Sequence, residues 1–488
     1  MGVPQKITPL RLMSTCEKSD FGHSLCAVYS FFIIFAHYLI KRKNFKYSLM
    51  ATIHLKKGLN LPLAGRLVDE SVSMAASCSC YAVVPDDFQG IVPRMDKREG
   101  DAVHAGDVLY HDKTHDAIKV VSPVSGVLKE VRRGERRKIE AIVIESDGTG
   151  AAIEHNVKRD VRELLLESGL WVMLRQRPYD VVPSPEVEPR DIFVTAFDSA
   201  PLAPNLLQVV GEKRQYLAAG VKALQTLTAG KVYVGFKDGE EFDIEGAEVN
   251  SFKGPHPAGN VGVQLANVKP VNKGEVVWTL DIVTLARIGE LMTTGKVPFD
   301  TLVAVTGERV KQPHYVHAIM GCTVEALLKD NLCDGDNRII SGNALSGVKV
   351  PLDGFLRAPY RHLTVIPEVS CPDEFMGWAA LSPKRFSIYR TFTSWLTGSK
   401  DIKMDARIKG GERAIVRLDE YDDMLPMDIY AEFLIKAIIT RNIDKMEQLG
   451  IYEVAPEDFA LAEYADTSKL ELQRIVREGL DFLRGELS

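Results

Sequence analysis

Two glycine-punctuated segments, at 90–110 and 121–146, constrain the fold of this chain most strongly. Each places valines at alternating positions between tight turns, a pattern that is typical of short β-strands. Gly-Asp pairs at 100–101 and 106–107 supply turns, because glycine tolerates positive φ and aspartate bonds its own backbone. The pattern predicts a flattened barrel of short strands within residues 50–150.

The turn Ser-Pro-Val-Ser-Gly at 122–126 is similar to the turn that follows the lysine-bearing hairpin of biotinyl and lipoyl domains. This resemblance implies a barrel-sandwich hybrid (biotinyl/lipoyl-like) domain. A carrier must hold its lysine at the hairpin tip, where the arm can swing. The tip position here is His115, and Lys113 and Lys119 only flank it. We therefore expect the fold without the carrier function. A biotin- or lipoyl-type carrier protein is the alternative, and it requires a modified lysine at the tip.

The first 49 residues differ in composition from the rest of the chain. An apolar run at 25–40 is followed by three basic residues at 41–43. A membrane-spanning helix needs ~20 apolar residues, and a secretory signal carries its charges before the apolar run, so neither description fits. We expect residues 1–49 to be an extension read from a false start upstream of Met50. The alternative is a marginal membrane anchor whose basic flank lies in the cytoplasm.

The charge balance and the cysteines argue against two kinds of partner. A total of 60 basic and 66 acidic residues leaves a net charge of −6, and this near balance gives no electrostatic argument for binding nucleic acid. The seven cysteines form no CxxC pair, and Cys78-Ser-Cys80 is too isolated for a four-ligand metal site. The sequence therefore predicts a reduced, cytoplasmic chain without a nucleic acid partner or a metal site.

Downstream of the barrel, the hydrophobic periodicity divides the chain into further units. Alternating helical and strand-like runs at 151–298 predict a Rossmann-like, mainly parallel α/β domain. Residues 299–350 contain a hairpin, a short helix and a strand, which we interpret as an SLBB-like β-grasp unit. Residues 351–418 form a β-rich return segment, and residues 419–488 form a helical C-terminal region. Its two long helices are expected at 428–450 and 468–487.

Several longer segments resemble one family in the same order along the chain. From Met50 to Ser488 the sequence is similar to the NqrA family, whose members belong to the Na⁺-translocating NADH:quinone oxidoreductase (Nqr). That family is related to RnfC and to the flavin-bearing subunit of respiratory complex I. The segments that carry this resemblance are IHLKKGLNLPLAG (53–65), SPVSGVLKEVRRGERRKIEAIVIES (122–146), ESGLWVMLRQRPYDVVP (167–183), VTAFDSAPLAPN (194–205), FKGPHPAGNVG (252–262) and IISGNALSG (339–347).

The resemblance implies a peripheral subunit on the cytoplasmic face of a bacterial inner membrane. It would belong to a complex of six subunits that passes electrons from NADH to ubiquinone, or to menaquinone, and exports Na⁺. The expected partners are the other Nqr subunits and the quinone. The isolated chain is not expected to catalyse the reaction. A cofactor-free scaffold subunit of a related Rnf-type complex is the alternative.

The resemblance also suggests that cofactors have been lost. Flavin-binding relatives hold the flavin phosphate with a glycine-rich loop, which lets backbone N–H groups approach the phosphate closely. In the matching stretch, 168–179, only the first glycine of that loop remains, and Trp171 and Leu174 would collide with an FMN phosphate. No cysteine follows Cys371, so the helical tail, a degenerate ferredoxin-like region, lacks ligands for an iron–sulfur cluster. We expect no tightly bound cofactor.

The segment 167–183 has two interpretations. In the first it contacts the quinone, with aromatic and proline rings beside the quinone ring and arginines polarising its carbonyls. In the second, Trp171 and its apolar neighbours fill the space that the flavin has left. The candidate quinone contacts are Trp171, Arg175, Arg177, Pro178 and Tyr179. A separate segment, GPHPAGNVG at 254–262, is expected to be an ordered turn, with anion binding near His256 as the alternative.

Overall fold

The computed structural model describes residues 52–68, 71–76, 78–369, 386–388, 390, 392–397, 401–416 and 419–487. The chain divides into two units, Met1–Ala51 and Thr52–Ser488, and the described residues belong to the second. The predicted extension 1–49 lies outside the described residues, as do Cys371 and the middle of the segment 351–418. No helix among the described residues is both long and apolar enough to cross a membrane.

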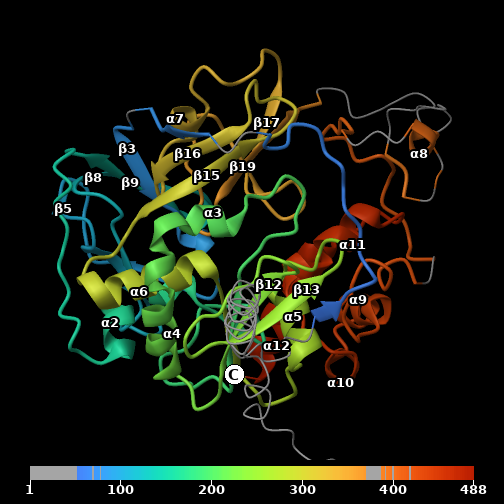
Figure 1. The fold of residues 1–488 in the computed structure, drawn as a ribbon, viewed down its shortest axis with the longest axis horizontal. Coiled ribbons are helices and arrows are strands. Elements are labelled where there is room, and N and C mark those ends of the chain that lie inside the picture. Colours follow the sequence, from blue (N-terminus) through green and yellow to red (C-terminus); the bar gives the residue numbers. More distant parts are fainter. Residues whose placement is uncertain are drawn as a thin grey trace, which may run out of the picture. The chain divides into compact units, whose positions relative to one another are not determined.

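The N-terminal part of this unit contains two antiparallel sheets whose strands are interleaved along the chain (Figure 1). Their strands are β3 (Cys80–Val83), β4 (Pro93–Met95), β5 (Ala102–Val103), β6 (Val108–Asp112), β7 (Lys119–Val121), β8 (Gly126–Arg133) and β9 (Ile139–Ser146). The strand orders are β3-β9-β8-β5 and β4-β6-β7. Leu109, Leu128 and Ile144 are fully buried in their core. The turn between β6 and β7 contains His115, as predicted for the hairpin tip, and the His115 carbonyl accepts a hydrogen bond from Ile118 N at 2.9 Å.

The α/β part is built on a six-stranded sheet with the order β1-β13-β12-β11-β14-β10, in which only β10 is antiparallel. The strands are β1 (Thr52–His54), β10 (Arg175–Arg177), β11 (Ile192–Thr195), β12 (Val232–Lys237), β13 (Glu248–Lys253) and β14 (Val277–Asp281), and the helices are α2 (Val161–Glu167), α3 (Leu206–Val210), α4 (Leu217–Gln225), α5 (Val261–Val268) and α6 (Ile282–Thr294). Neighbouring residues of β11 point to opposite faces of the sheet. Val194 belongs to the core with α4 and α6, whereas Phe193 stacks on Tyr233 and packs with Leu265 of α5. The mainly parallel sheet with helices on both faces confirms the expected α/β domain (Figure 1).

Helices α4 and α6 cross closely enough to need glycine at the contact. A Cβ atom at Gly289 of α6 would overlap the carbonyl oxygen of Tyr216, and one at Gly220 of α4 would overlap that of Leu285. Glycine normally weakens a helix interior, by roughly 1 kcal/mol relative to alanine. Its presence at both positions is explained by the close packing of the two backbones.

A second six-stranded sheet, with the order β18-β17-β19-β15-β16-β2, forms the β-grasp part. Its elements are β2 (Val72–Met74), β15 (Asp300–Thr306), β16 (His314–Ile319), α7 (Val324–Leu328), β17 (Asn337–Ser341), β18 (Val348–Val350) and β19 (His362–Pro367). β15 and β16 form an antiparallel hairpin with Asp300 opposite Ile319, which confirms the predicted hairpin.

Three strands lie in a different sheet from the one their sequence neighbours suggest. β1 and β2 come from the segment 50–150, yet β1 pairs with β13 of the α/β sheet and β2 pairs with β16 of the β-grasp sheet. Likewise, β19 comes from the segment 351–418 and lies between β15 and β17. Alternation along a strand indicates which face is buried, but it does not say which partner strand will accept the hydrogen bonds.

The C-terminal region is helical. Its helices are α9 (Ala431–Ile439), α10 (Ile443–Gln448), α11 (Ala460–Ala465) and α12 (Leu472–Leu487), and the short α8 (Ser394–Thr397) precedes them. The single helix expected at 428–450 is wrong, because the chain breaks between α9 and α10. At the break Arg441 has φ +52, and Asn442 Oδ1 caps the new helix by accepting from Lys445 N at 3.0 Å. The core of this region continues into the α/β part through Phe252 and Val263.

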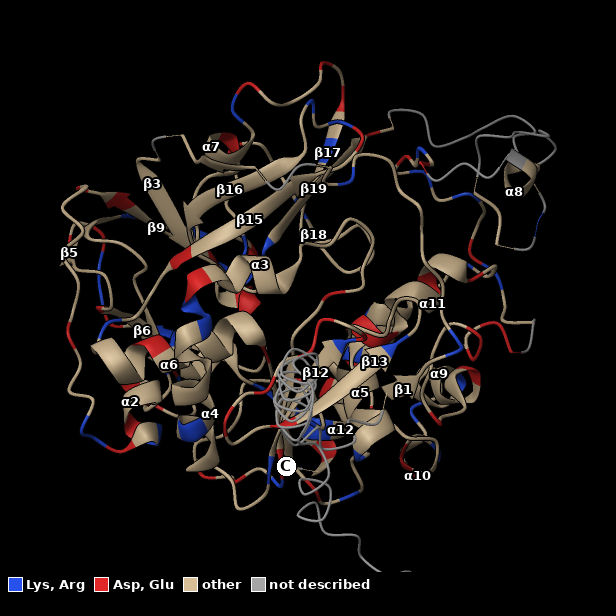
Figure 2. Ribbon diagram, in the orientation of Figure 1, with Lys and Arg blue, Asp and Glu red and all other residues tan. Residues whose placement is uncertain are grey.

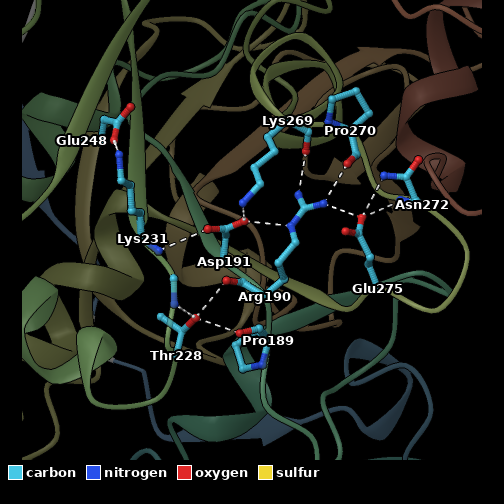
Figure 3. Close-up of polar contacts among 11 residues, drawn as sticks. Pro189, Arg190, Asp191, Thr228, Lys231, Glu248, Lys269, Pro270, Asn272 and Glu275 are labelled. Atoms are coloured by element: carbon cyan, nitrogen blue, oxygen red, sulfur yellow. Dashed lines mark hydrogen bonds and ion pairs between the residues drawn. The ribbon is translucent and has the colours of Figure 1, made fainter.

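Charged residues of both signs are interspersed along the described part of the chain (Figure 2). One carboxylate, Asp191, is 1% exposed and lies just before β11 (Figure 3). It accepts hydrogen bonds from Lys269 Nζ at 2.6 Å, Arg190 Nε at 2.8 Å and Lys231 N at 3.1 Å. Arg190 also donates to the carbonyls of Lys269 and Pro270 and to Glu275. The cluster therefore ties the start of β11 to the loop between α5 and β14.

We expect Asp191→Asn to lower the free energy of unfolding by about 1–3 kcal/mol at neutral pH, since the amide loses charge-assisted hydrogen bonds in a buried place. Burial opposes ionisation of Asp191, but the bonds from Lys269, Lys231 and Arg190 outweigh it and lower its pKa. A carboxylate whose pKa is lower in the folded state stabilises the protein above its unfolded pKa, and this contribution disappears as the pH falls through the folded pKa.

Urea unfolding of the wild type and Asp191→Asn between pH 3 and pH 7 checks this expectation. The stability difference should shrink toward the acid end. The exposed Asp353→Asn is the matched control and should show no comparable difference. A difference for Asp191→Asn that stays constant with pH would contradict the assignment.

Candidate functional site

A cavity of about 300 Å³ lies where the α/β, β-grasp and helical parts meet, and we call it the cleft. Thr195 at the end of β11 and Asp281 at the end of β14 both line it. Arg361 of the β-grasp part and Glu457 of the helical region line other sides. The carboxyl ends of parallel strands are the usual ligand-binding edge of an α/β sheet, so the cleft is the leading candidate site.

The α/β wall of the cleft carries polar groups on loops that follow the strands. Asp198, after β11, accepts a hydrogen bond from Ala200 N at 2.8 Å, and its exposed side chain faces the cleft. The Asp198 side chain is exposed to the cavity, but the surrounding walls of the cleft still desolvate it and raise its pKa, and the nearby charge of Asp281 adds to the effect. Asp281 itself caps α6 by accepting from Thr284 N at 2.6 Å.

His256 is held in this wall by the N-terminal segment of the unit. Its backbone N donates to Asn60 Oδ1 at 2.9 Å, and its carbonyl accepts from Leu59 N at 2.8 Å. Gly58 has φ +112, and a Cβ there would overlap the His256 carbonyl oxygen. The backbone of His256 is therefore clamped from the side of β1, which explains why a glycine precedes these residues.

The imidazole of His256 is only 4% exposed and lines the cleft. Its Nδ1 lies 3.0 Å from Ser199 Oγ, and that hydroxyl accepts a hydrogen bond from Gly259 N at 2.8 Å. Its Nε2 has no hydrogen-bond partner in the described part of the chain. Burial lowers the pKa of His256 to about 4, so the ring is neutral at physiological pH.

The β-grasp wall contributes Arg361 and His362. Arg361 is 5% exposed, and its Nη1 donates to the carbonyls of Ala358 and Tyr360 at 2.8 and 3.2 Å. Its Nε is buried and finds no partner among the described residues. His362 Nε2 is 2.7 Å from Thr306 Oγ1, and burial lowers the pKa of His362 to about 3. Arg361 is thus the cationic group that this wall presents to the cleft.

Glu457 and Asp180 line the cleft from the helical side. The Glu457 side chain is 46% exposed and lies 3.3 Å from Arg177 Nη2. Partial desolvation raises the pKa of Glu457, and the like charge of Asp458 raises it further, although Arg177 works against both. The cleft therefore combines the cationic Arg361 with two carboxyl groups, Asp198 and Glu457, whose pKa values are raised.

Of the five candidate quinone contacts, Trp171 lies deepest in the protein. Its side chain is fully buried and does not line the cleft. Its indole Nε1 donates to the carbonyl of Pro183 at 2.9 Å, and its ring meets Trp278 edge to face, with centroids 5.1 Å apart. This environment favours the interpretation that Trp171 fills space in the core.

Arg175 is the one candidate contact that lines the cleft. It is half-buried, and its guanidinium donates to the carbonyls of Asp87 at 2.6 Å and Val172 at 3.2 Å. Arg177, in contrast, is 1% exposed and bonded to Asp458 Oδ2 at 3.0 Å. The structure therefore brings the two arginines to different environments.

Pro178 and Tyr179 follow Arg177 on the path toward the cleft. Pro178 is buried, and the Arg177–Pro178 peptide bond is cis. Tyr179 is half-buried against the helical core, and its carbonyl accepts from Arg477 Nη2 at 2.6 Å. Both residues lie outside the cleft lining and hold the loop that carries Asp180 into it.

Sequence reasoning did not single out Asp198, Asp180 or Arg361, and it interpreted the surroundings of His256 as a turn. The turn interpretation holds for the backbone, since Ala258 N and Asn260 N bond back to the carbonyls of Pro255 and Pro257 at 2.9 Å. One signal could have indicated Asp198 as a site residue. It follows a predicted strand of a parallel sheet, and ligands bind at the carboxyl ends of such strands.

Comparisons with known proteins place this chain in one protein family. Models of the NqrA N-terminal barrel-sandwich hybrid domain, the NqrA second alpha/beta domain and the NqrA C-terminal domain match residues 53–147, 157–297 and 302–351. NqrA from the Na(+)-translocating NADH-quinone reductase of Neisseria meningitidis serogroup C is 32% identical over 447 residues, which are 89% of this chain and 100% of that protein. The chain belongs to the NqrA family.

Other NqrA proteins align with this chain over the same share of their length. The protein of Saccharophagus degradans is 34% identical and that of Vibrio anguillarum 33%, each over 89% of this chain and 100% of its own length. The expected barrel-sandwich hybrid, α/β and SLBB-like units are confirmed by these matches and by the sheets described above. An NAD⁺-reducing [NiFe]-hydrogenase aligns over 44% of this chain and 48% of its own, at 14% identity and a TM-score of 0.31, which is too low to carry an inference.

The stretch that corresponds to a flavin-phosphate loop does not fit a flavin in this NqrA chain. Trp171, Val172 and Leu174 are each at most 1% exposed, so their backbone is covered by the protein itself. Gly169 has φ +74, and a Cβ there would lie 2.7 Å from Val121 Cγ2 of the neighbouring barrel. The glycine is needed for close packing between two parts of the protein, and the backbone of Trp171, Val172 and Leu174 is not open to a phosphate.

Proposed function

We propose that this chain is the peripheral NqrA component of a six-subunit, Na⁺-translocating NADH:quinone reductase on the cytoplasmic face of a bacterial inner membrane. Full-length similarity to proteins of that name carries the proposal. In this role the chain holds neither a flavin nor an iron–sulfur cluster, and the partner subunits carry the electrons. The buried stretch around Trp171 supports the first point. For the second, the helical region contains no cysteine, and Ala462 and Ala465 of α11 are packed in its core.

The proposed contribution of the chain to the reaction is to bind the quinone, ubiquinone or menaquinone, in the cleft. The segment 171–180 forms one wall, with Arg175 and Asp180 facing the ligand. Trp171, Arg177, Pro178 and Tyr179 hold that wall in place rather than touch the ring. This division refines the five candidate contacts according to the environment of each side chain.

Reduction of a quinone to a quinol adds two electrons and two protons. The partner subunits deliver the electrons. Asp198 and Glu457 are suited to supply protons to the two quinone oxygens, because desolvation in the cleft raises the pKa of each carboxyl group. The carrier-protein alternative is not favoured, since His115 occupies the hairpin tip where a modified lysine would be attached.

Three measurements on the purified full chain test this proposal. It should contain no stoichiometric FMN and should not oxidise NADH, and isothermal titration calorimetry with a short-chain ubiquinone should give a saturable single site. Arg175→Met should weaken that binding by about fivefold, since it removes a positive charge beside the carbonyl oxygens. The matched control Arg159→Met lies on the exposed surface and should not change it. Bound FMN, NADH oxidation or the absence of saturable quinone binding would each contradict the proposal.

A further inference from the structure

His256 has an unused polar atom that the proposed proton supply does not involve. His256 lines the cleft, and its Nε2 is buried and has no partner among the described residues, although nearly all buried polar atoms in proteins are hydrogen-bonded. The ring cannot turn away to find a partner elsewhere, because Nδ1 is bonded to Ser199 Oγ and the backbone is clamped by Leu59 and Asn60. A fixed, unsatisfied polar atom in a residue that lines a cavity points to a ligand.

The hydrogen bonds of Ser199 are compatible with a tautomer in which Nε2 of His256 carries the proton. Ser199 Oγ accepts from Gly259 N, so its own hydrogen is free to be donated. Within the described residues Nδ1 is the acceptor that lies beside it, at 3.0 Å. In a neutral imidazole the other nitrogen then carries the hydrogen. With Ser199 donating to Nδ1, Nε2 is a neutral N–H donor in the wall of the cleft.

The charges around this donor select the class of ligand. The cleft is lined by carboxyl groups, among them Asp198, Asp281 and Glu457, as well as by the guanidinium groups of Arg175 and Arg361, so it has no excess of positive charge that would select a phosphate. A neutral N–H group in such surroundings suits an uncharged acceptor, and a ring carbonyl is the one that the proposed function provides. As the carbonyl takes up electrons its oxygen becomes more negative, and a preorganised donor then binds it more strongly.

We propose that His256 Nε2–H donates a hydrogen bond to one carbonyl oxygen of a quinone ring bound in the cleft. This inference rests on the proposed quinone function and names the donor on the α/β wall. His256 binds and polarises the ring and does not transfer its own proton. Ser199 is the positioning residue that sets the tautomer.

Two variants of His256 separate this role from a purely structural one. In His256→Gln the amide nitrogen can replace Nε2 as a donor, whereas in His256→Asn the shorter side chain keeps a partner for Ser199 but cannot reach the ligand. Titration of each full-length variant with a short-chain ubiquinone should leave the affinity of His256→Gln within about threefold of the wild type and weaken that of His256→Asn by about tenfold. Thermal unfolding should show that both variants are folded.

The same variants in the assembled complex provide a second readout. His256→Asn should raise the KM for the short-chain ubiquinone and leave the rate of NADH oxidation with an artificial electron acceptor unchanged. Equal quinone affinity in His256→Asn and His256→Gln, with wild-type binding intact, would overturn the role of His256 and leave the proposed function standing. If the wild-type chain binds no quinone, or if inorganic phosphate displaces it, the proposed quinone site and this inference both fail.

Discussion

Arg177→Met is expected to lower the free energy of unfolding by about 3–5 kcal/mol. The side chain of Arg177 is 1% exposed and that of its partner Asp458 is fully buried, with Arg177 Nη1 3.0 Å from Asp458 Oδ2. Asp458 also accepts from Ala455 N at 2.9 Å, so its charge cannot move to solvent when the arginine is removed. The cost comes mainly from the carboxylate that is left buried without a counter-charge.

Chemical denaturation of three variants checks this account of Arg177. The double variant Arg177→Met/Asp458→Asn should recover part of the loss, because no uncompensated charge remains. Arg159→Met removes an exposed arginine that pairs with Glu163 at 3.2 Å, and it should cost less than about 1 kcal/mol. If Arg177→Met were no more destabilising than Arg159→Met, the ion pair would not have the structural role assigned here.

Trp171→Ala should cost about 3–5 kcal/mol of stability, the usual range for removing a fully buried aromatic side chain. The substitution removes the edge-to-face contact with Trp278, removes the hydrogen bond to the Pro183 carbonyl and leaves a void beside the barrel. Arg162, which lies 6.0 Å above the ring, loses its cation–π contact as well. The effect is expected on stability and not on quinone contact.

Trp171→Phe separates packing from ligand binding. It keeps an aromatic ring in the core and should cost only about 1–2 kcal/mol, chiefly for the hydrogen bond to Pro183 and the lost contact area. Quinone affinity, measured by calorimetry, should be unchanged in the folded Trp171→Phe protein. A variant of near wild-type stability that had lost quinone binding would show that the indole touches the ligand after all.

The sequence predicted features that depend on local pattern. The β15–β16 hairpin and the alternation of strands and helices in the α/β part follow from periodicity, and the position of His115 follows from the spacing to a turn. The pairing of β1 with β13 and of β2 with β16 did not follow, because register and partner choice depend on contacts far apart in the sequence.

The candidate site was harder to predict for a related reason. Arg177 and Asp458 are 281 positions apart, and no local sequence pattern near either residue indicates that they form an ion pair. An arginine that contacts a ligand and an arginine that is paired in the core look the same in one sequence, as do a buried and a ligand-stacking tryptophan. Arg175 lines the cleft while Arg177 does not, although both belong to the short strand β10, because their guanidinium groups find partners in different parts of the protein.

Co-purification tests the central claim, that this chain works within a Na⁺-translocating NADH:quinone reductase, most directly. A tagged full-length chain, extracted from the membranes of its own host in mild detergent, should carry the other subunits with it. The purified material should reduce short-chain ubiquinone with NADH in a Na⁺-stimulated reaction, and deletion of the chain should abolish that activity in the membranes. Recovery of the chain alone, with membrane activity unaffected by its deletion, would contradict the account.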